Sequence, residues 1–96
     1  MKTLEYIKQQ IVQKKSFLQA KYHIKYLAIF GSVSRGENND ESDIDILVDF
    51  SEPIGIEFID LADELEKILQ NKVDLVSRNA IKPKYFSQIK NELQYV

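Results

Sequence analysis

Residues 43–50 alternate between two kinds of side chain, and this alternation constrains the fold more than any other feature. One parity is wholly apolar and the other is mostly acidic, namely Ile44, Ile46, Val48 and Phe50 against Asp43, Asp45, Leu47 and Asp49. Successive side chains of a β-strand point to opposite faces, so the segment predicts a half-buried strand whose aspartates point away from the core. Such a strand requires a sheet with one covered face.

Two further segments predict strands. Residues 26–30, with the sequence YLAIF, form a short apolar run that ends at Gly31, which is typical of a strand buried on both faces. Residues 73–76, with the sequence VDLV, are rich in Val and Leu and predict a third strand. The sheet is therefore expected to hold at least three strands.

Helical spacing of apolar residues marks three other segments. One amphipathic helix is predicted over residues 3–20, a second over the apolar stripe from Phe58 to Leu69, and a closing helix after Pro83. The stripe of the closing helix comprises Phe86, Ile89, Leu93 and Val96. The resulting order, α-β-β-α-β-α, predicts an α+β fold with a small mixed sheet flanked by helices.

Length and composition exclude several classes of protein. A chain of 96 residues with 44% hydrophobic residues suits one domain, residues 1–96. There is no cysteine for a disulfide or a thiolate metal site, no signal-peptide pattern, and no apolar stretch near the roughly 18 residues of a membrane span. We therefore expect a cytoplasmic protein without membrane contact.

Charge is distributed unevenly along the chain. The net charge of −2 argues against direct, sequence-independent binding of nucleic acid. Residues 37–66 contain many acids and neither Lys nor Arg. This acidic block could hold cations or face a basic partner, and a solvated surface is an equally good explanation.

Asp43 and Asp45 lie two residues apart on a predicted strand, so their carboxylates share one face. Like charges at this distance repel, and a divalent cation such as Mg²⁺ makes the pair tolerable. Solvent-facing aspartates are the simpler alternative, but Asp74 interrupts an apolar strand, where a ligand role explains it better. An EF-hand is excluded because Val48 and Ile54 occupy the positions of its required Gly and Glu.

Gly31 and Ser32 follow a buried strand, where free backbone N–H groups can bind phosphate oxygens. Arg35 could pair with a phosphate or form a structural ion pair with an acid such as Asp40 or Asp43. Ser42 could contact a nucleotide, although a role in orienting its loop is favoured. His23, the only histidine, is assigned to the turn after the first helix.

Together GSVSRGENNDESDID (31–45) and the later VDLV resemble the minimal nucleotidyltransferases of the DNA polymerase beta-like superfamily, over nearly the whole chain. The resemblance implies Asp43, Asp45 and Asp74 as catalytic metal ligands, for which two Mg²⁺ ions are expected. It also implies Gly31 and Ser32 at the triphosphate, with Arg35 and Ser42 as further nucleotide-binding candidates.

Small members of this group resemble the MntA-type antitoxins of HEPN/MNT toxin-antitoxin pairs. The resemblance implies transfer of AMP from ATP to a hydroxyl, expected to be a tyrosine, of a HEPN-type ribonuclease toxin. Two alternatives stay open: an antitoxin that neutralises its partner by binding alone, or the catalytic subunit of a split small-molecule nucleotidyltransferase.

Overall fold

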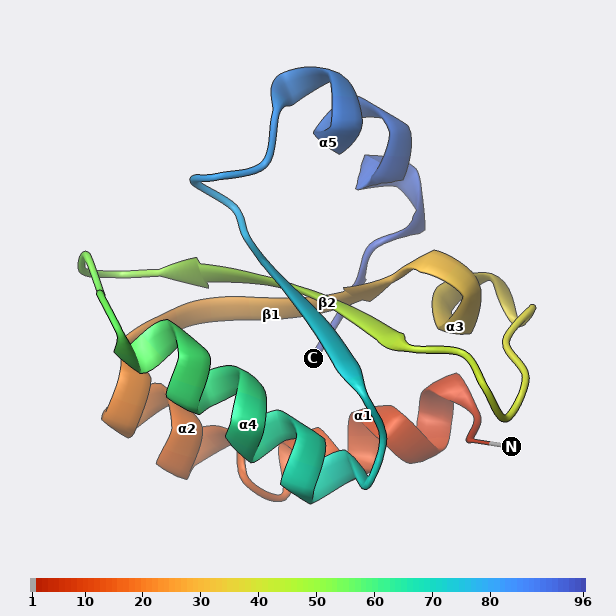
Figure 1. Cartoon of the computed structure of the whole chain (residues 1–96), viewed down its shortest axis with the longest axis horizontal. Coiled ribbons are helices and arrows are strands. Elements are labelled where there is room, and N and C mark those ends of the chain that lie inside the picture. Colours follow the sequence, from red (N-terminus) through yellow and green to blue (C-terminus); the bar gives the residue numbers. More distant parts are fainter. Residues whose placement is uncertain (1) are drawn as a thin grey trace.

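A four-stranded mixed sheet forms the centre of the computed structural model, which describes residues 2–96 (Figure 1). Its strands are β1 (Ile24–Phe30), β2 (Ile44–Phe50), β3 (Val73–Ser77) and β4 (Gln94–Tyr95), in the spatial order β3-β2-β1-β4. β1 runs antiparallel to both β2 and β4, and β2 runs parallel to β3. The predicted α+β class with a small mixed sheet is confirmed.

The helices are α1 (Leu4–Val12), α2 (Lys15–Tyr22), α3 (Gly31–Arg35), α4 (Glu57–Leu69) and α5 (Pro83–Ile89), and a 3₁₀ turn η1 (Lys90–Glu92) follows α5. In Figure 1, α1, α2 and α4 lie on one side of the sheet and α5 lies on the other. Within residues 2–96, no helix has the length and apolar character needed to cross a membrane.

The main core lies between the sheet and helices α1, α2 and α4. The apolar parity of β2 points into it, since Ile44, Ile46 and Val48 are almost fully buried beside Leu61 and Leu65 of α4. Burial of such side chains contributes roughly 1.5 to 3 kcal/mol each, so this face fixes the orientation of β2. The aspartates of the other parity consequently point to the opposite face, as predicted.

A smaller apolar cluster lies on that opposite face, beneath α5. It is formed by the buried residues Phe30, Leu47 and Ile89, with Phe86 and Leu93 packed against them. Leu47 is the one apolar residue of its parity in β2, and the cluster explains it as the anchor of α5. α5 therefore stands over the same face of the sheet as Asp45.

The helix predicted over residues 3–20 is two helices, which is a correction. α1 ends at Val12 and α2 begins at Lys15, with a turn in which the Lys14 N–H donates to the Ile11 carbonyl. The apolar spacing of Ile11 and Leu18 continues across the turn, so periodicity alone does not reveal it. His23 ends α2 with φ of 55°, which confirms its assignment to a turn.

The closing helix is also shorter than predicted. α5 begins at Pro83 as expected but ends at Ile89, and the chain then forms η1 and β4. Leu93 is extended, and the backbone beyond it pairs with the free edge of β1, where the Val96 N–H donates to the Leu27 carbonyl. Backbone pairing to that edge thus replaces the last helical turns of the predicted stripe.

Candidate active site

Two of the predicted carboxylates lie side by side in the sheet. Asp45 of β2 and Asp74 of β3 are direct partners in the parallel register, and Asp43 immediately precedes β2. Adjacent partners in a sheet point to the same face, so the carboxylates of Asp45 and Asp74 share the face beneath α5. Residues separated by 29 positions of sequence are thus brought together by strand pairing.

Asp45 lies in an environment that opposes its charge. Partial burial raises the pKa of Asp45 to about 6, with further increases from the negative charges of Asp74, Asp43 and Glu92, while Arg35 opposes the shift. Carboxylates with pKa values raised by desolvation and neighbouring like charges are found preferentially at functional sites, which makes Asp45 a candidate.

The donor set suits a hard divalent cation. Carboxylate oxygens are the ligands that Mg²⁺ prefers, and a cation would relieve the repulsion that acts on Asp45. In the described part of the chain, no three His, Asp or Glu side chains already stand as a closed set of metal ligands. Asp43 and Asp74 are solvent-exposed, and their negative charges act on Asp45 by raising its pKa.

Gly31 leaves the space in which Asp45 lies. A Cβ at position 31 would stand 2.0 Å from Oδ2 of Asp45 and 3.0 Å from its Cγ, and Gly31 has φ of +75°. The close approach follows from the register, since Phe30 is the direct partner of Asp45 in β2. Position 31 therefore requires glycine both for its backbone conformation and for the carboxylate beside it.

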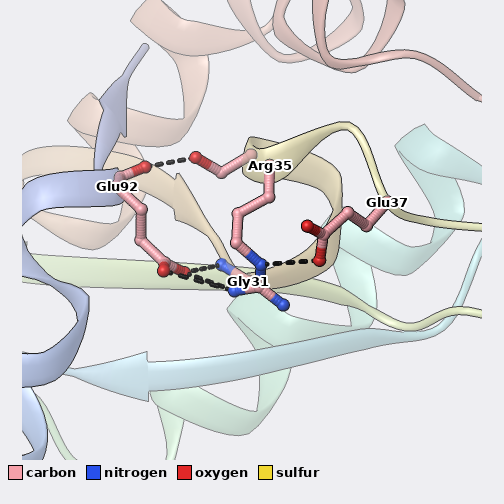
Figure 2. Close-up of polar contacts among 5 residues, drawn as sticks. Gly31, Arg35, Glu37 and Glu92 are labelled. Carbon is pink, nitrogen blue, oxygen red and sulfur yellow. Dashed lines mark hydrogen bonds and ion pairs between the residues drawn. The ribbon is translucent and has the colours of Figure 1, made fainter.

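Glu92 accepts hydrogen bonds from the backbone of Gly31 and from the guanidinium group of Arg35. The Gly31 N–H donates to Oε2 of Glu92 at 2.5 Å, and Nη1 of Arg35 donates to Oε1 and Oε2 at 3.2 and 3.1 Å (Figure 2). The hydroxyl of Ser34 donates to the Glu92 carbonyl. The segment η1 is thereby fixed against α3.

Arg35 forms the structural ion pairs that were considered for it, but with other partners. Its Nε donates to Glu37 at 3.0 Å, and Nη1 pairs with Glu92, in place of Asp40 or Asp43 (Figure 2). Both hydrogen bonds raise the pKa of Arg35, which keeps it charged. Its interaction with Asp45 shows that the guanidinium also lies within electrostatic range of the carboxylates.

A cavity of about 440 Å³ opens beside these groups. It is lined by the end of β1, the start of α3, Asp45, α5 and η1, and its residues are Phe30, Gly31, Ser32, Arg35, Asp45, Tyr85, Gln88, Ile89 and Glu92. Tyr85, Gln88 and Glu92 were not among the residues predicted from the sequence to lie at the site. A helix that continued through residue 96 gave no reason to place them near Gly31.

Ser42 lies away from this cavity. Its hydroxyl accepts a hydrogen bond from the Asn39 N–H at 2.9 Å, and its carbonyl accepts one from the Asn71 side chain at 3.1 Å. These contacts fit the role in loop orientation that was favoured for Ser42 and leave its nucleotide-binding role without geometric support.

A larger cavity of about 520 Å³ lies at the carboxyl ends of β2 and β3. Its walls are mainly apolar, with Phe50, Phe58 and Leu75 among them, and Asp43, Asp45 and Asp74 do not line it. The chemistry of phosphoryl transfer needs charged oxygens and donors, so the smaller cavity beside Asp45 is the candidate active site.

The family model for polymerase beta nucleotidyltransferases matches residues 9–95, which includes every group described above. The chain belongs to this family. The resemblance predicted from the Gly-Ser, Asp-x-Asp and later strand aspartate is therefore confirmed, and with it the assignment of the chain to the nucleotidyltransferases.

Full-length relatives in this nucleotidyltransferase family share the size of the chain. A protein of Thermococcus cleftensis named protein adenylyltransferase MntA is 38% identical over 97 residues, which cover 100% of this chain and 98% of the relative. A protein of Methanocaldococcus jannaschii, provisionally named a protein adenylyltransferase, is 45% identical over 100 residues and is covered completely, as is this chain.

Solved structures place the same fold in a complex. A toxin-antitoxin crystal structure with AMP-PNP contains a chain that matches with a TM-score of 0.74 and 26% identity, covering 91% of this chain and 69% of that one. AMP-PNP is an ATP analogue, so that complex holds a nucleotide triphosphate mimic.

Proposed function

We propose that this nucleotidyltransferase transfers AMP from ATP to a hydroxyl of a partner toxin, and so acts as an antitoxin. The observation that carries the proposal is the register pairing of Asp45 with Asp74, in which Asp45 lies beside Gly31 and lines a cavity. Support comes from relatives named protein adenylyltransferases and from the toxin-antitoxin structure with AMP-PNP.

Asp43, Asp45 and Asp74 would hold Mg²⁺, for which two ions are expected. When bound, such ions neutralise the phosphates and lower the pKa of an attacking oxygen. The burial of Asp45 and the solvent exposure of Asp43 and Asp74 fit this role. We assign the triphosphate to the Gly31 N–H, the Ser32 hydroxyl and the Arg35 guanidinium.

In the transfer step, the acceptor oxygen forms a bond to the α-phosphorus while the bond between that phosphorus and the bridging oxygen of the β-phosphate breaks. AMP remains on the acceptor, and pyrophosphate leaves with the bonding electrons. Asp74 is solvent-exposed on the edge strand β3, which supports approach of an acceptor from outside, and we assign its carboxylate the role of accepting the hydroxyl proton.

The acceptor is assigned to a tyrosine of a HEPN-type ribonuclease toxin, as the family resemblance implies. The acidic block of residues 37–66 surrounds Asp43 and Asp45 in the sequence, and it offers negative charge to a basic partner. Electrostatic attraction of this kind raises the rate of encounter more than the final affinity.

The test is incubation of the purified chain with ATP, Mg²⁺ and the product of a neighbouring toxin-like gene, followed by intact-mass spectrometry of the partner. The expected result is a mass increase of one or more AMP groups on the partner, mapped to tyrosine, which disappears with Asp43→Asn or without Mg²⁺. Equal AMP labelling of the partner by Asp43→Asn and by wild type would contradict the enzymatic proposal.

The same preparation separates catalysis from binding alone. A variant that lacks the carboxylates of Asp43 and Asp45 is expected to lose neutralisation of the partner ribonuclease while still forming a complex with it. Full neutralisation by that variant would favour an antitoxin that masks its partner, because masking needs surface and no metal.

A further inference from the structure

The carboxylate of Glu92 contacts two of the three groups that the proposed function assigns to the triphosphate, Gly31 and Arg35. Its Oε2 accepts from the Gly31 N–H at 2.5 Å, and both of its oxygens accept from Arg35 (Figure 2). A backbone N–H and a guanidinium are also the donors that recognise a phosphate. In this arrangement Glu92 satisfies both donors with an anion from the chain itself.

The position of Glu92 is set by the fold and is not an incidental surface contact. η1 lies between α5, anchored by Ile89 in the smaller core, and β4, paired with β1. The Ser34 hydroxyl donates to the Glu92 carbonyl, and the side chain is only 20% exposed. The position of the carboxylate beside Gly31 is therefore set by the packing of α5 before it and by the pairing of β4 with β1 after it.

We propose that Glu92 competes with the triphosphate for Gly31 and Arg35, and that its side chain must leave these groups before ATP binds. The inference rests on the proposed function, because it takes the phosphate position from there. A phosphate oxygen and the Glu92 carboxylate cannot both accept from the single N–H of Gly31. Their like charges would also repel each other at that distance.

The exchange conserves the contacts of the donors. On binding, Arg35 and Gly31 trade a carboxylate for a phosphate, while the bond between Ser34 and the Glu92 carbonyl can persist, so only one side chain has to rotate. Glu92 consequently lowers the affinity for the nucleotide without contributing to the chemical step. We therefore expect a substitution of Glu92 to change the Kd for ATP.

The experiment is calorimetric titration of the full chain with MgATP, comparing wild type with Glu92→Gln. If the competing contact is populated in most molecules, removing its charge lowers the apparent Kd by about five- to tenfold. The same gain is expected with magnesium tripolyphosphate, and none with adenosine, which lacks phosphates. Glu92→Ala provides a second variant in which no amide oxygen can replace the carboxylate.

Glu37→Gln is the matched control. Glu37 accepts from the same Arg35 guanidinium at 3.0 Å, whereas the acceptor of the Gly31 N–H is Glu92. Glu37→Gln removes an equal charge from Arg35 and is expected to change the Kd for MgATP by less than about twofold, in keeping with an exposed ion pair. An equal gain in both variants would contradict the proposal, because general electrostatics would then account for it.

The outcomes separate the inference from the proposed function. If wild type binds MgATP and transfers AMP, but Glu92→Gln and Glu92→Ala bind no more tightly, the inference is wrong and the function stands. If neither wild type nor the variants bind MgATP, both are wrong. Tighter binding of MgATP by both Glu92 variants, without a comparable gain in Glu37→Gln, supports the competition.

Discussion

Asp45 lies in the space that a side chain at position 31 would fill, because a Cβ built on Gly31 would stand 2.0 Å from the Asp45 carboxylate. The glycine that ends β1 and the aspartate that begins the functional face of β2 are therefore complementary in shape. Since Phe30 and Asp45 are register partners, this fit is fixed by the pairing of the two central strands.

Gly31→Ala is expected to abolish nucleotide transfer. The added methyl group would force the Asp45 carboxylate out of the space that it occupies beside Gly31, and the residue would keep a φ of +75° that costs an L-amino acid roughly 1 to 2 kcal/mol. The measurement is Mg²⁺-dependent AMP transfer together with thermal unfolding. Activity near the wild-type level would show that Asp45 need not occupy this space.

Gly36→Ala is the control for that variant. Gly36 also has a positive φ, +70°, but a Cβ there would meet nothing within 4 Å. The variant is expected to lose about 1 kcal/mol of stability through backbone strain, with AMP transfer retained. If it lost activity as completely as Gly31→Ala, strain in α3 rather than displacement of Asp45 would be the cause.

Asp45→Asn is expected to inactivate the enzyme and, without Mg²⁺, to stabilise it near pH 7. Burial, Asp74 and Asp43 raise the pKa of Asp45 to about 6, so its ionised form is unfavourable in the folded protein. Allowing for solvent screening, the gain in the free energy of unfolding is about 1 kcal/mol. Chemical denaturation in EDTA at several pH values measures it.

The pH dependence of this gain has a definite sign. A carboxyl whose folded pKa exceeds its unfolded value favours the folded state at low pH, and this contribution is lost as the pH rises through the folded pKa. Metal-free wild type should therefore lose stability between about pH 4 and pH 6 relative to Asp45→Asn, and the curves should converge at lower pH. A constant difference across this range would refute the assignment.

Asp74→Asn is expected to lower the rate of AMP transfer by about 10² to 10⁴-fold, the range found when a catalytic acid-base group is removed. Asp49→Asn is the control, because Asp49 shares the parity of Asp45 on β2 but lies near the other end of the strand, where it accepts from the Phe50 N–H. Single-turnover assays should show wild-type rates for Asp49→Asn. A comparable loss in both would remove the special role of Asp74.

Ile89→Ala is expected to destabilise the protein by about 2 to 4 kcal/mol, because Ile89 is 6% exposed and anchors α5 on Phe30 and Leu47. Loosening α5 also displaces Tyr85 and Gln88 from the cavity, so the KM for ATP should rise. Ile59→Ala, at a position 60% exposed on α4, should change stability by less than about 0.5 kcal/mol.

The central sheet was predictable because its residues satisfy local and global demands together. The strict alternation through Ile44 and Ile46 fixes which face of β2 is buried, and the apolar run before Gly31 marks β1. The α4 stripe from Phe58 to Leu69 is confirmed within Glu57–Leu69. In the parallel pairing of β2 and β3, Asp45 and Asp74 are register partners, which the sequence pattern of either strand alone does not determine.

The C-terminal segment differs from its prediction because backbone pairing there outweighs side-chain periodicity. Leu93 and Val96 continue the spacing of α5, yet the last residues pair with the edge of β1 as a strand of two residues, too short to show alternation. Glu92 was missed for the same reason. It lies 61 positions from Gly31, and only the turn between α5 and β4 brings it there.

The parallel pairing of β2 with β3 also makes the candidate site sensitive to register. A slip of β3 by one residue would turn Asp74 to the face that packs on α4, where its charge would be buried. The same slip would expose Val73 and remove its side chain from the core. The hydrophobic contacts that stabilise the sheet therefore also favour the register that aligns its carboxylates. A chain with β3 in the wrong register would therefore be less stable than the native fold, and a stably folded protein with misaligned carboxylates is not expected.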